Sequence, residues 1–183
     1  MENQKKYNII YADPPWRYEQ HTVSGAAENH YHTMSMEELY VLPVKEIADR
    51  NAVLFLWATF PKLPEAISLM EPWGFHYITV AFVWIKLNKK ALTPYTGLGF
   101  WTRSNAEICL LGKKGTPKRQ SAKIHQLIFS PRQEHSQKPV IVRDKIVELM
   151  GDLPRIELFA RETVSGWDAW GNEVPCSISL SPQ

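Results

Sequence analysis

The apolar positions of the chain gather in five short runs that are predicted to be buried β-strands. Isoleucine, valine, leucine and aromatic residues dominate these runs, and polar residues do not alternate regularly with apolar ones. This pattern is typical of a parallel sheet that is covered on both faces. The five predicted strands are Asn8–Ala12, Ala52–Trp57, Ile78–Ile85, Ile108–Leu111 and Ile156–Ala160.

Helix signals separate these strands. Ser35 and Glu38 have the spacing of a capping box, which opens a helix that Pro43 interrupts or restarts. A second helix is predicted over Lys62–Met70 and ends at the turn formed by residues 72–74, which contains a proline and a glycine.

A third helix is predicted over Pro139–Met150, with proline in the favoured first position and Gly151 at its end. Its buried face is a stripe of apolar residues at helical spacing, namely Val142, Ile146, Leu149 and Met150. The alternation of strands and helices predicts an α/β fold with a doubly wound, mostly parallel sheet.

Three polar segments fit neither element, and each is rich in Gly, Pro, Ser or Thr: Arg17–Thr33, Asn88–Ser104 and Lys113–Lys123. Loops of this length in a compact domain are usually functional or disordered. In a doubly wound fold we expect them beyond the carboxyl ends of the strands, where ligands bind. Residues 1–173 are predicted to form a single domain, followed by a loosely ordered tail over residues 174–183.

Composition narrows the class of protein. The chain has 183 residues, 44% of them hydrophobic, which is enough for one sizeable core. Cys109 and Cys176 fit no metal or redox spacing, and Cys109 is predicted to be a buried free thiol, which favours a reducing compartment. The sequence contains neither a signal peptide nor an apolar stretch that approaches the length of a membrane span, so a cytoplasmic location is expected.

Charge is distributed unevenly along the chain. Residues 86–145 contain 13 Lys or Arg and 3 acidic residues, whereas the rest of the chain contains 8 basic and 16 acidic residues. This asymmetry suggests one face that meets a polyanion, although a set of solvated basic loops would give the same count. Gly97–Gly99 lacks the third glycine of a dinucleotide fingerprint, and there is neither a Walker motif nor a cluster with metal-ligand spacing, so we expect no metal.

The stretch Asp13-Pro14-Pro15-Trp16 carries the most specific chemistry. The two prolines hold the backbone extended and supply no N–H donors, which leaves the Asp13 carboxylate and the backbone carbonyl groups as acceptors. Such a site fits a planar ligand with an exocyclic amino group, and the indole of Trp16 would stack on the ring. Alternatively, the stretch is a turn, and Trp16 is a core residue.

Eight motifs resemble those of the MT-A70 family of S-adenosylmethionine-dependent adenine-N6 methyltransferases. The resemblance covers most of the chain and keeps the family's order of motifs. The motifs are YADPPW (11–16), YHTMS (31–35), LFLWAT (54–59), WGF (73–75), GLGFWTRSNAEICLLGKKG (97–115), EHSQKP (134–139), ELFAR (157–161) and GWDAWGNE (166–173). The resemblance implies a Rossmann-like methyltransferase fold that is circularly permuted, with the catalytic motif ahead of the cofactor motif.

The cofactor implied is S-adenosyl-L-methionine. Lys138 precedes a predicted helix start, which makes it a candidate partner for the methionine carboxylate. The resemblance places Glu157, Phe159, Arg161, Asn172 and Glu173 next to the cofactor, together with Asp13, although Glu157 and Phe159 are equally compatible with structural roles in the core. His135 is expected to orient neighbouring groups rather than to act as a catalyst, and His21, His30 and His32 to lie on a lid.

The expected reaction is direct methyl transfer to N6 of an adenine that has been flipped out of DNA. Asp13 and the Pro14 carbonyl would orient the amino group, and Pro15 and Trp16 complete the catalytic motif. The predicted nucleic-acid contacts are Arg103 and the basic residues of the segment 112–123, namely Lys113, Lys114, Lys118, Arg119 and Lys123. The compact chain resembles bacterial and phage DNA enzymes, whereas RNA as substrate, a non-catalytic subunit, and a homodimer or heterodimer are left open.

Overall fold

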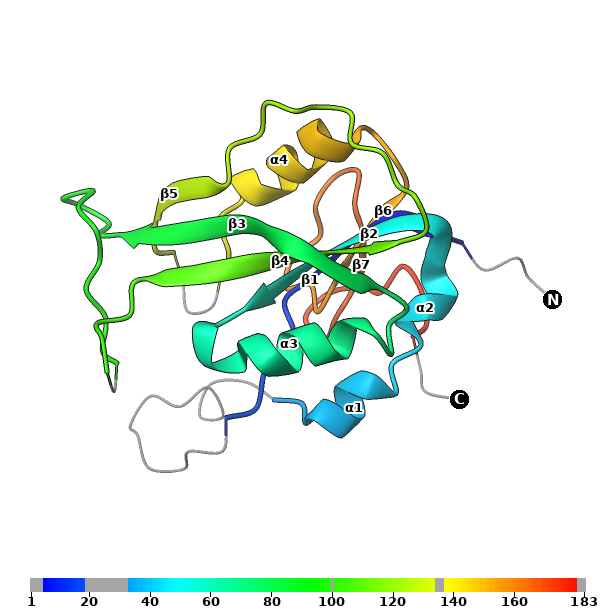
Figure 1. Ribbon diagram of the computed structural model, residues 1–183, viewed down its shortest axis with the longest axis horizontal. Helices are drawn as coiled ribbons and strands as arrows, with labels where there is room; N and C mark the ends of the chain where they lie inside the picture. Colours follow the sequence, from blue (N-terminus) through cyan, green and yellow to red (C-terminus); the bar gives the residue numbers. More distant parts are fainter. Residues whose placement is uncertain (1–4, 19–32, 100, 134–136, 181–183) are drawn as a thin grey trace.

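The computed structural model describes residues 5–18, 33–99, 101–133 and 137–180, and they form a mixed α/β fold (Figure 1). Within these residues, seven strands form one sheet in the order β5-β3-β4-β2-β1-β6-β7. The strands are β1 (Tyr7–Ala12), β2 (Ala48–Ala58), β3 (His76–Leu87), β4 (Ala106–Lys114), β5 (Leu127–Pro131), β6 (Arg155–Leu158) and β7 (Asp168–Trp170).

The direction of the strands decides which loops meet at the same edge of the sheet. Strand β1 lies in the middle and pairs in parallel with both β2 and β6, and β6–β7 and β3–β5 are also parallel. Strand β4 runs the opposite way, antiparallel to both β2 and β3. The sheet is therefore mostly parallel, as predicted, and the carboxyl ends of all the strands except β4 lie at one edge.

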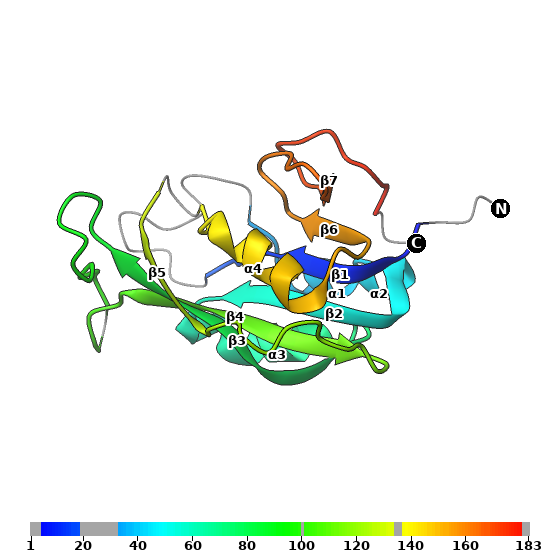
Figure 2. The same cartoon turned by 90° about the horizontal axis from the view of Figure 1, so that it is seen from above.

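Helices cover both faces of the sheet (Figure 2). On one face, α1 (Met36–Tyr40), α2 (Val44–Ile47) and α3 (Leu63–Met70) bury Leu39, Val44 and Leu69 against residues of β1 and β2. On the other face, α4 (Ile141–Met150) buries Val142, Ile146 and Met150 against β1 and β2. The predicted apolar stripe of this helix thus faces the sheet.

Local signals in the sequence explain most of the helix boundaries. The capping box of α1 is present, because Ser35 and Glu38 bond to each other's backbone N–H groups, and α2 follows directly after Pro43. Helix α4 ends at Gly151, whose positive φ of 94° favours glycine. It begins at Ile141 rather than at Pro139, so the predicted start of this helix was two residues too early.

Two of the three polar segments lie where they were expected. Asn88–Ser104 and the described ends of Arg17–Thr33 follow β3 and β1 at the carboxyl edge of the sheet, whereas residues 19–32 lie outside the described part of the chain. The expectation was wrong for Lys113–Lys123, because β4 is antiparallel and delivers this segment to the opposite edge. There Lys114 pairs with Ala52, near the start of β2.

The strands β5 and β7 were not predicted. The described part of the expected tail, residues 174–180, forms no helix or strand but contacts the domain at two points. The Ser177 N–H donates to the carbonyl of Ala169 at 2.7 Å, and Leu180 is buried in the core. Cys109 is a buried free thiol, as predicted. Among the helices described here, none has the length and apolar character needed to cross a membrane.

Candidate active site

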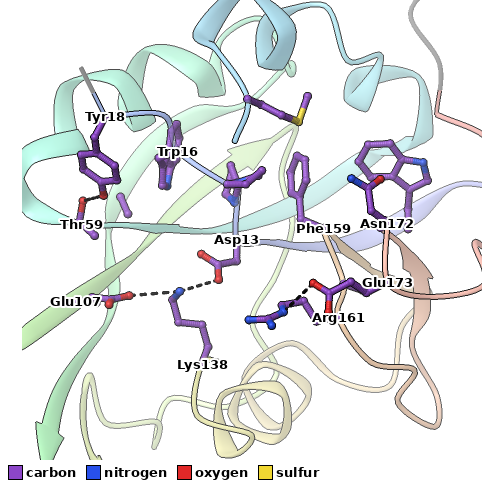
Figure 3. Close-up of a pocket in the computed structure, with 17 residues that line it drawn as sticks. Asp13, Trp16, Tyr18, Thr59, Glu107, Lys138, Phe159, Arg161, Asn172 and Glu173 are labelled. Atoms are coloured by element: carbon purple, nitrogen blue, oxygen red, sulfur yellow. Dashed lines mark hydrogen bonds and ion pairs between the residues drawn. The ribbon is translucent and has the colours of Figure 1, made fainter. Parts of the chain in front are cut away.

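The Asp-Pro-Pro-Trp stretch forms part of a cavity of about 330 Å³ at the carboxyl edge of the sheet (Figure 3). Strands β1, β2 and β6 and the segment after β7 contribute its walls. All four residues of the tetrapeptide line it, as do six of the seven residues predicted to bind the cofactor, Asp13 being in both sets. Its lining residues are Asp13, Pro14, Pro15, Trp16, Tyr18, Met34, Ala58, Thr59, Glu107, Lys138, Phe159, Ala160, Arg161, Trp170, Gly171, Asn172 and Glu173.

Four charged side chains of alternating sign, Lys86, Glu107, Lys138 and Asp13, form a charge chain beside the cavity. Lys138 Nζ lies 2.6 Å from Asp13 Oδ2 and 3.3 Å from Glu107 Oε2. The carboxylate of Glu107 also pairs with the ammonium of Lys86, at 2.5 Å. The ammonium of Lys138 is therefore paired with two carboxylates of this chain and holds that of Asp13 in place.

Burial and this charge chain shift the pKa of each group. Burial raises the pKa of Asp13 above its ordinary value, an effect that the Lys138 ammonium opposes and the Glu107 charge reinforces. Burial alone would lower the pKa of Lys138, but Asp13 and Glu107 raise it. Burial would likewise raise the pKa of Glu107, but Lys138 and Lys86 lower it. Lys138 and Glu107 are thus held in their charged forms.

Two carbonyl groups of the tetrapeptide, whose residues line the cavity, accept backbone hydrogen bonds. The Pro14 carbonyl accepts from the Trp16 N–H at 2.9 Å, and the Pro15 carbonyl accepts from the Met34 N–H at 2.9 Å. Each carbonyl oxygen has two lone pairs, so the Pro14 carbonyl retains the capacity to accept another hydrogen bond.

Trp16 is more buried than the prediction of a stacking surface implies. Its side chain is only 6% exposed, and its indole N–H donates to the Trp57 carbonyl at 3.1 Å. This is the position of a core residue whose ring also forms part of the cavity wall. Tyr18, which lies nearby, lines the same side of the cavity, and its hydroxyl is 2.5 Å from Thr59 Oγ1.

Asp13 lies between two groups of side chains, as Figure 3 shows. Trp16, Tyr18 and Thr59 lie on one side, and Phe159 and Asn172 lie on the other. The arrangement offers two compartments that meet at one carboxylate. Such a site can bring two ligands together at Asp13.

The second compartment is built around Phe159, which directly follows β6. Its φ of 60° is unusual for a residue other than glycine, and strain of this kind tends to occur at functional sites. The ring stacks on Trp73 at a centroid distance of 6.5 Å and meets Trp170 edge-on at 5.4 Å. Phe159 therefore combines the two roles considered for it, as a packing residue and as a wall of the cavity.

The polar groups of this compartment come from the ends of β6 and β7. Arg161 Nε donates to Glu173 Oε1 at 3.0 Å, and Asn172 lies beside this pair (Figure 3). The intervening Gly171 is required here, because a Cβ at this position would lie 2.3 Å from the carbonyl oxygen of Ala160.

Glu157 lines a second cavity of about 250 Å³, which shares five lining residues with the first: Asp13, Lys138, Phe159, Arg161 and Glu173. Its carboxylate forms a two-pronged pair with Arg143 of α4, at 2.6 and 3.0 Å. Burial raises the pKa of Glu157, although Arg143 opposes this shift. The alternative role considered for Glu157, a structural pair within the fold, is therefore present in the structure.

Several residues that line the site were not identified from the sequence. Glu107 lies inside the apolar run of β4, where a charged residue needs a partner, and this was the signal that could have identified it. Tyr18 carries no comparable signal, whereas Met34, Thr59 and Trp170 lie inside the quoted motifs but were not singled out as site residues. Glu134, His135 and the three histidines of the expected lid lie outside the described residues.

The predicted nucleic-acid contacts fall into two groups. Arg103 lies in the segment between β3 and β4, at the edge of the sheet where the cavity opens. Lys113 and Lys114 lie at the end of β4 on the opposite edge, where Lys114 Nζ donates to the carbonyl groups of Lys45 and Ala48. The remaining basic residues, Lys118, Arg119 and Lys123, follow β4 on that side. The structure thus does not bring the two groups together.

No cluster of side chains that could hold a metal ion is found among the residues that the structure describes.

Comparison with known proteins identifies the family. The family model MT-A70 matches residues 7–173. A "Type II methyltransferase M.MunI" from Mycoplasma sp is 39% identical over 192 residues, which cover 93% of this chain and 79% of that protein.

Eukaryotic relatives are more distant and much longer. An Arabidopsis thaliana "N(6)-adenosine-methyltransferase MT-A70-like" protein is 28% identical over 92% of this chain and 24% of its own length. The Homo sapiens "N(6)-adenosine-methyltransferase catalytic subunit METTL3" is 27% identical over 97% of this chain and 30% of its own length. With a family model that matches almost the whole chain and a relative of similar size, the chain belongs to the MT-A70 family.

Proposed function

We propose that this protein transfers a methyl group from S-adenosyl-L-methionine to N6 of adenine in DNA. The observation that carries the proposal is the position of Asp13 at the meeting point of two compartments, one on the Trp16 side and one on the Phe159 side (Figure 3). Similarity to a type II methyltransferase over most of both chains favours DNA over RNA as the substrate.

The Phe159 compartment fits the proposed cofactor. The whole cavity of about 330 Å³, which includes the Trp16 side, is within the range of small-molecule sites, and its Phe159 side combines aromatic walls with a few polar groups. Phe159 and Trp170 offer surfaces for the adenine of the cofactor, and Asn172, Glu173 and Arg161 offer partners for the ribose. S-adenosyl-L-methionine would supply an electrophilic methyl group on its sulfonium sulfur.

Lys138 is proposed to bind the cofactor's carboxylate, as the sequence predicts, but it has a second role in this arrangement. It is paired with Asp13 and Glu107, so its ammonium would have to be shared with, or released by, these carboxylates when an anion binds. Its charge also favours the ionised form of Asp13, which is the form that accepts hydrogen bonds from an amino group.

The remaining chemistry is positioning. The Asp13 carboxylate and the second lone pair of the Pro14 carbonyl would accept the two hydrogens of the adenine amino group and direct its nitrogen toward the other compartment. The amino group must lose one proton when it gains the methyl group. Burial raises the pKa of Asp13, which makes its carboxylate a better proton acceptor than an exposed aspartate.

The proposed fold within the α/β class is a circularly permuted Rossmann-like methyltransferase. Strand β1, which leads into the catalytic motif, is the first strand of the chain, whereas β6, which leads into the proposed cofactor site, is the sixth. The two are nevertheless direct neighbours in the sheet, with Ala12 opposite Leu158. This order supports a permuted arrangement of motifs. The Mycoplasma relative favours a bacterial cell as the setting.

The test is methyl transfer from labelled S-adenosyl-L-methionine to unmethylated plasmid DNA and to matched RNA, with nucleoside analysis of the product. We expect N6-methyladenine in DNA. Asp13→Ala should lower turnover by about a thousandfold or more while the affinity for the cofactor, measured by calorimetry, changes little.

Three outcomes would change the proposal. Labelled RNA without labelled DNA would overturn the substrate and keep the reaction. Cofactor binding without transfer to either nucleic acid would favour a non-catalytic subunit. Loss of both binding and turnover in Asp13→Ala, with an altered circular dichroism spectrum, would mean that Asp13 supports the fold rather than the chemistry.

A further inference from the structure

The segment that joins β3 to β4 exposes two large apolar side chains. This segment, residues 88–105, is called the arm here, and it projects beyond the carboxyl edge of the sheet (Figures 1 and 2). Near its tip, Trp101 is 98% exposed and Leu98 is 83% exposed, which makes them the most exposed large apolar residues among those the structure describes. Exposed apolar residues that lie close together often mark an interaction site.

The backbone of the arm holds this tip in a defined shape. Its two legs approach so closely that a Cβ at Gly97 would lie 2.3 Å from the Ser104 carbonyl oxygen, and a Cβ at Gly99 would lie 2.0 Å from that of Thr102. The Gly97 N–H donates to the Ser104 carbonyl at 3.0 Å. Leu98 lies between the two glycines, so the close approach of the legs keeps its side chain on the outside.

The base of the arm is tied to the active site. The Lys86 carbonyl accepts from the Tyr95 N–H at 2.7 Å, and the Lys86 N–H donates to the Asn105 carbonyl at 2.9 Å. The ammonium of the same Lys86 pairs with Glu107, which lines the catalytic cavity. The tip therefore projects from the same structural unit that holds the charge chain of Asp13.

The charge of the arm matches a nucleic acid. Residues 86–106 include Lys86, Lys89, Lys90 and Arg103 and no acidic residue. A basic segment with an exposed aromatic tip is the combination that proteins use to bend or open a duplex, because cations contact the phosphates and an apolar wedge enters between base pairs.

An enzyme that modifies a base within a duplex must also fill or tolerate the gap that the flipped base leaves behind. Unstacking a base is unfavourable, and a flat side chain that enters the gap restores part of the lost stacking. The residues that line the cavity cannot fill this gap, because they would contact the flipped base and not the base pairs on either side of the gap.

We propose that the tip of the arm, Leu98 and Trp101, inserts into the DNA duplex beside the target adenine and stabilises the state in which that adenine occupies the cavity. This inference rests on the proposed function, because it concerns the same reaction on DNA. It assigns the arm a role in opening the duplex, distinct from the methyl-transfer step at Asp13.

The test compares a paired with a pre-opened substrate. Methylated sites are first mapped on plasmid DNA treated with the unsubstituted protein, and a duplex of that sequence is made with the target adenine opposite either thymine or an abasic site. We expect Trp101→Ala to lower kcat/KM on the paired duplex by about tenfold or more and to change it less than about twofold on the pre-opened duplex. Trp101→Phe should recover most of the loss, whereas Trp101→Lys should not.

A second measurement follows flipping without methyl transfer. With 2-aminopurine at the target position, the unsubstituted protein should raise the fluorescence of the duplex, and Trp101→Ala should raise it less at saturating protein. The matched control is Tyr77→Ala, which removes an exposed aromatic ring from β3 at the far edge of the sheet. It should behave as the unsubstituted protein does.

The outcomes separate the two proposals. If Trp101→Ala lowers kcat/KM equally on both duplexes, or on neither, the wedge is overturned and the proposed methyl transfer stands. Sedimentation that shows a dimer for the unsubstituted protein and a monomer for Trp101→Ala, with equal losses on both duplexes, would assign the tip to a contact between copies of the chain. No transfer by the unsubstituted protein to any DNA would overturn the proposed function and the wedge with it.

Discussion

At the scale of single residues, the proposed chemistry depends on the ionisation of one partly buried carboxylate, that of Asp13. Burial raises the pKa of Asp13, whereas the charges of Lys138, at 2.6 Å, and of Arg161 oppose this shift. Glu107 has two effects. It holds Lys138 in position, and its negative charge makes Asp13 harder to ionise.

This arrangement predicts the effect of Glu107→Gln on the pH profile. Removing the charge of Glu107 lowers the pKa of Asp13, so the catalytic carboxylate stays ionised to lower pH. The acid limb of kcat/KM for methyl transfer should therefore shift to lower pH in Glu107→Gln. Glu107→Asp, which keeps the charge, should leave the acid limb of kcat/KM near the pH at which it lies in the unsubstituted protein. A shift to higher pH in Glu107→Gln would contradict the assignment of the limb to Asp13.

At the scale of elements, α4 is joined to β6 by a buried ion pair. Both groups of Arg143–Glu157 are largely buried, with side-chain exposures of 11% and 12%, and both Glu157 oxygens are bonded. Removing one partner of such a pair leaves the other charge buried and uncompensated, which is more destabilising than removing both.

We therefore expect Arg143→Met to lower the free energy of unfolding by about 3 kcal/mol, measured by urea denaturation. The double variant Arg143→Met with Glu157→Leu should recover much of this loss. Lys145→Met removes a positive charge from the same helix and should change stability by less than about 0.5 kcal/mol. An equal loss in the single and double variants would indicate that packing, rather than the uncompensated carboxylate, is the cause.

At the scale of the whole molecule, positive charge lies at two opposite edges of the sheet. The arm carries Lys89, Lys90 and Arg103 at the edge with the cavity, and the segment after β4 carries three basic residues on the other side. A duplex that places an adenine in the cavity meets the first group, and it reaches the second only if it follows the surface around the molecule.

Salt dependence distinguishes these groups. Changing Lys89, Lys90 and Arg103 together to Gln should lower the slope of log Kd against log salt by about 2 to 3, because each phosphate that a side chain neutralises adds roughly 0.9 to the slope. The matched variant, with Lys118, Arg119 and Lys123 changed to Gln, should leave the slope nearly unchanged. An equal fall in both variants would mean that the DNA reaches the far edge, as the sequence alone predicts.

Much of the fold and the centre of the site could be predicted because their signals are local. The apolar runs located β1, β2, β3, β4 and β6, since strands buried on both faces need continuous apolar sequence. The strands β5 and β7 were missed because they are short and consist largely of polar or partly exposed residues. Asp13 and Lys138 were identified from motifs more than 100 residues apart, and the sheet brings them within 2.6 Å.

What was missed depends on strand direction and on tertiary pairing. An apolar run has the same composition whichever way the strand points, so the reversal of β4, and with it the position of Lys113–Lys123, could not be read from the pattern. Glu107 was overlooked because its partners, Lys86 and Lys138, lie far from it in the chain. Trp16 was considered either as a stacking surface or as a core residue; its N–H donates to the Trp57 carbonyl in the core, and its side chain also lines the cavity.

The reversed strand also sets a length scale for the DNA. Strand β4 carries Glu107 at the catalytic edge and Lys114 at the other, and this stretch of extended chain measures about 24 Å. At roughly 3.4 Å per base pair, that distance corresponds to about seven base pairs of B-form DNA. Contact with both ends of β4 would therefore need a footprint longer than this, in which the duplex curves around the protein.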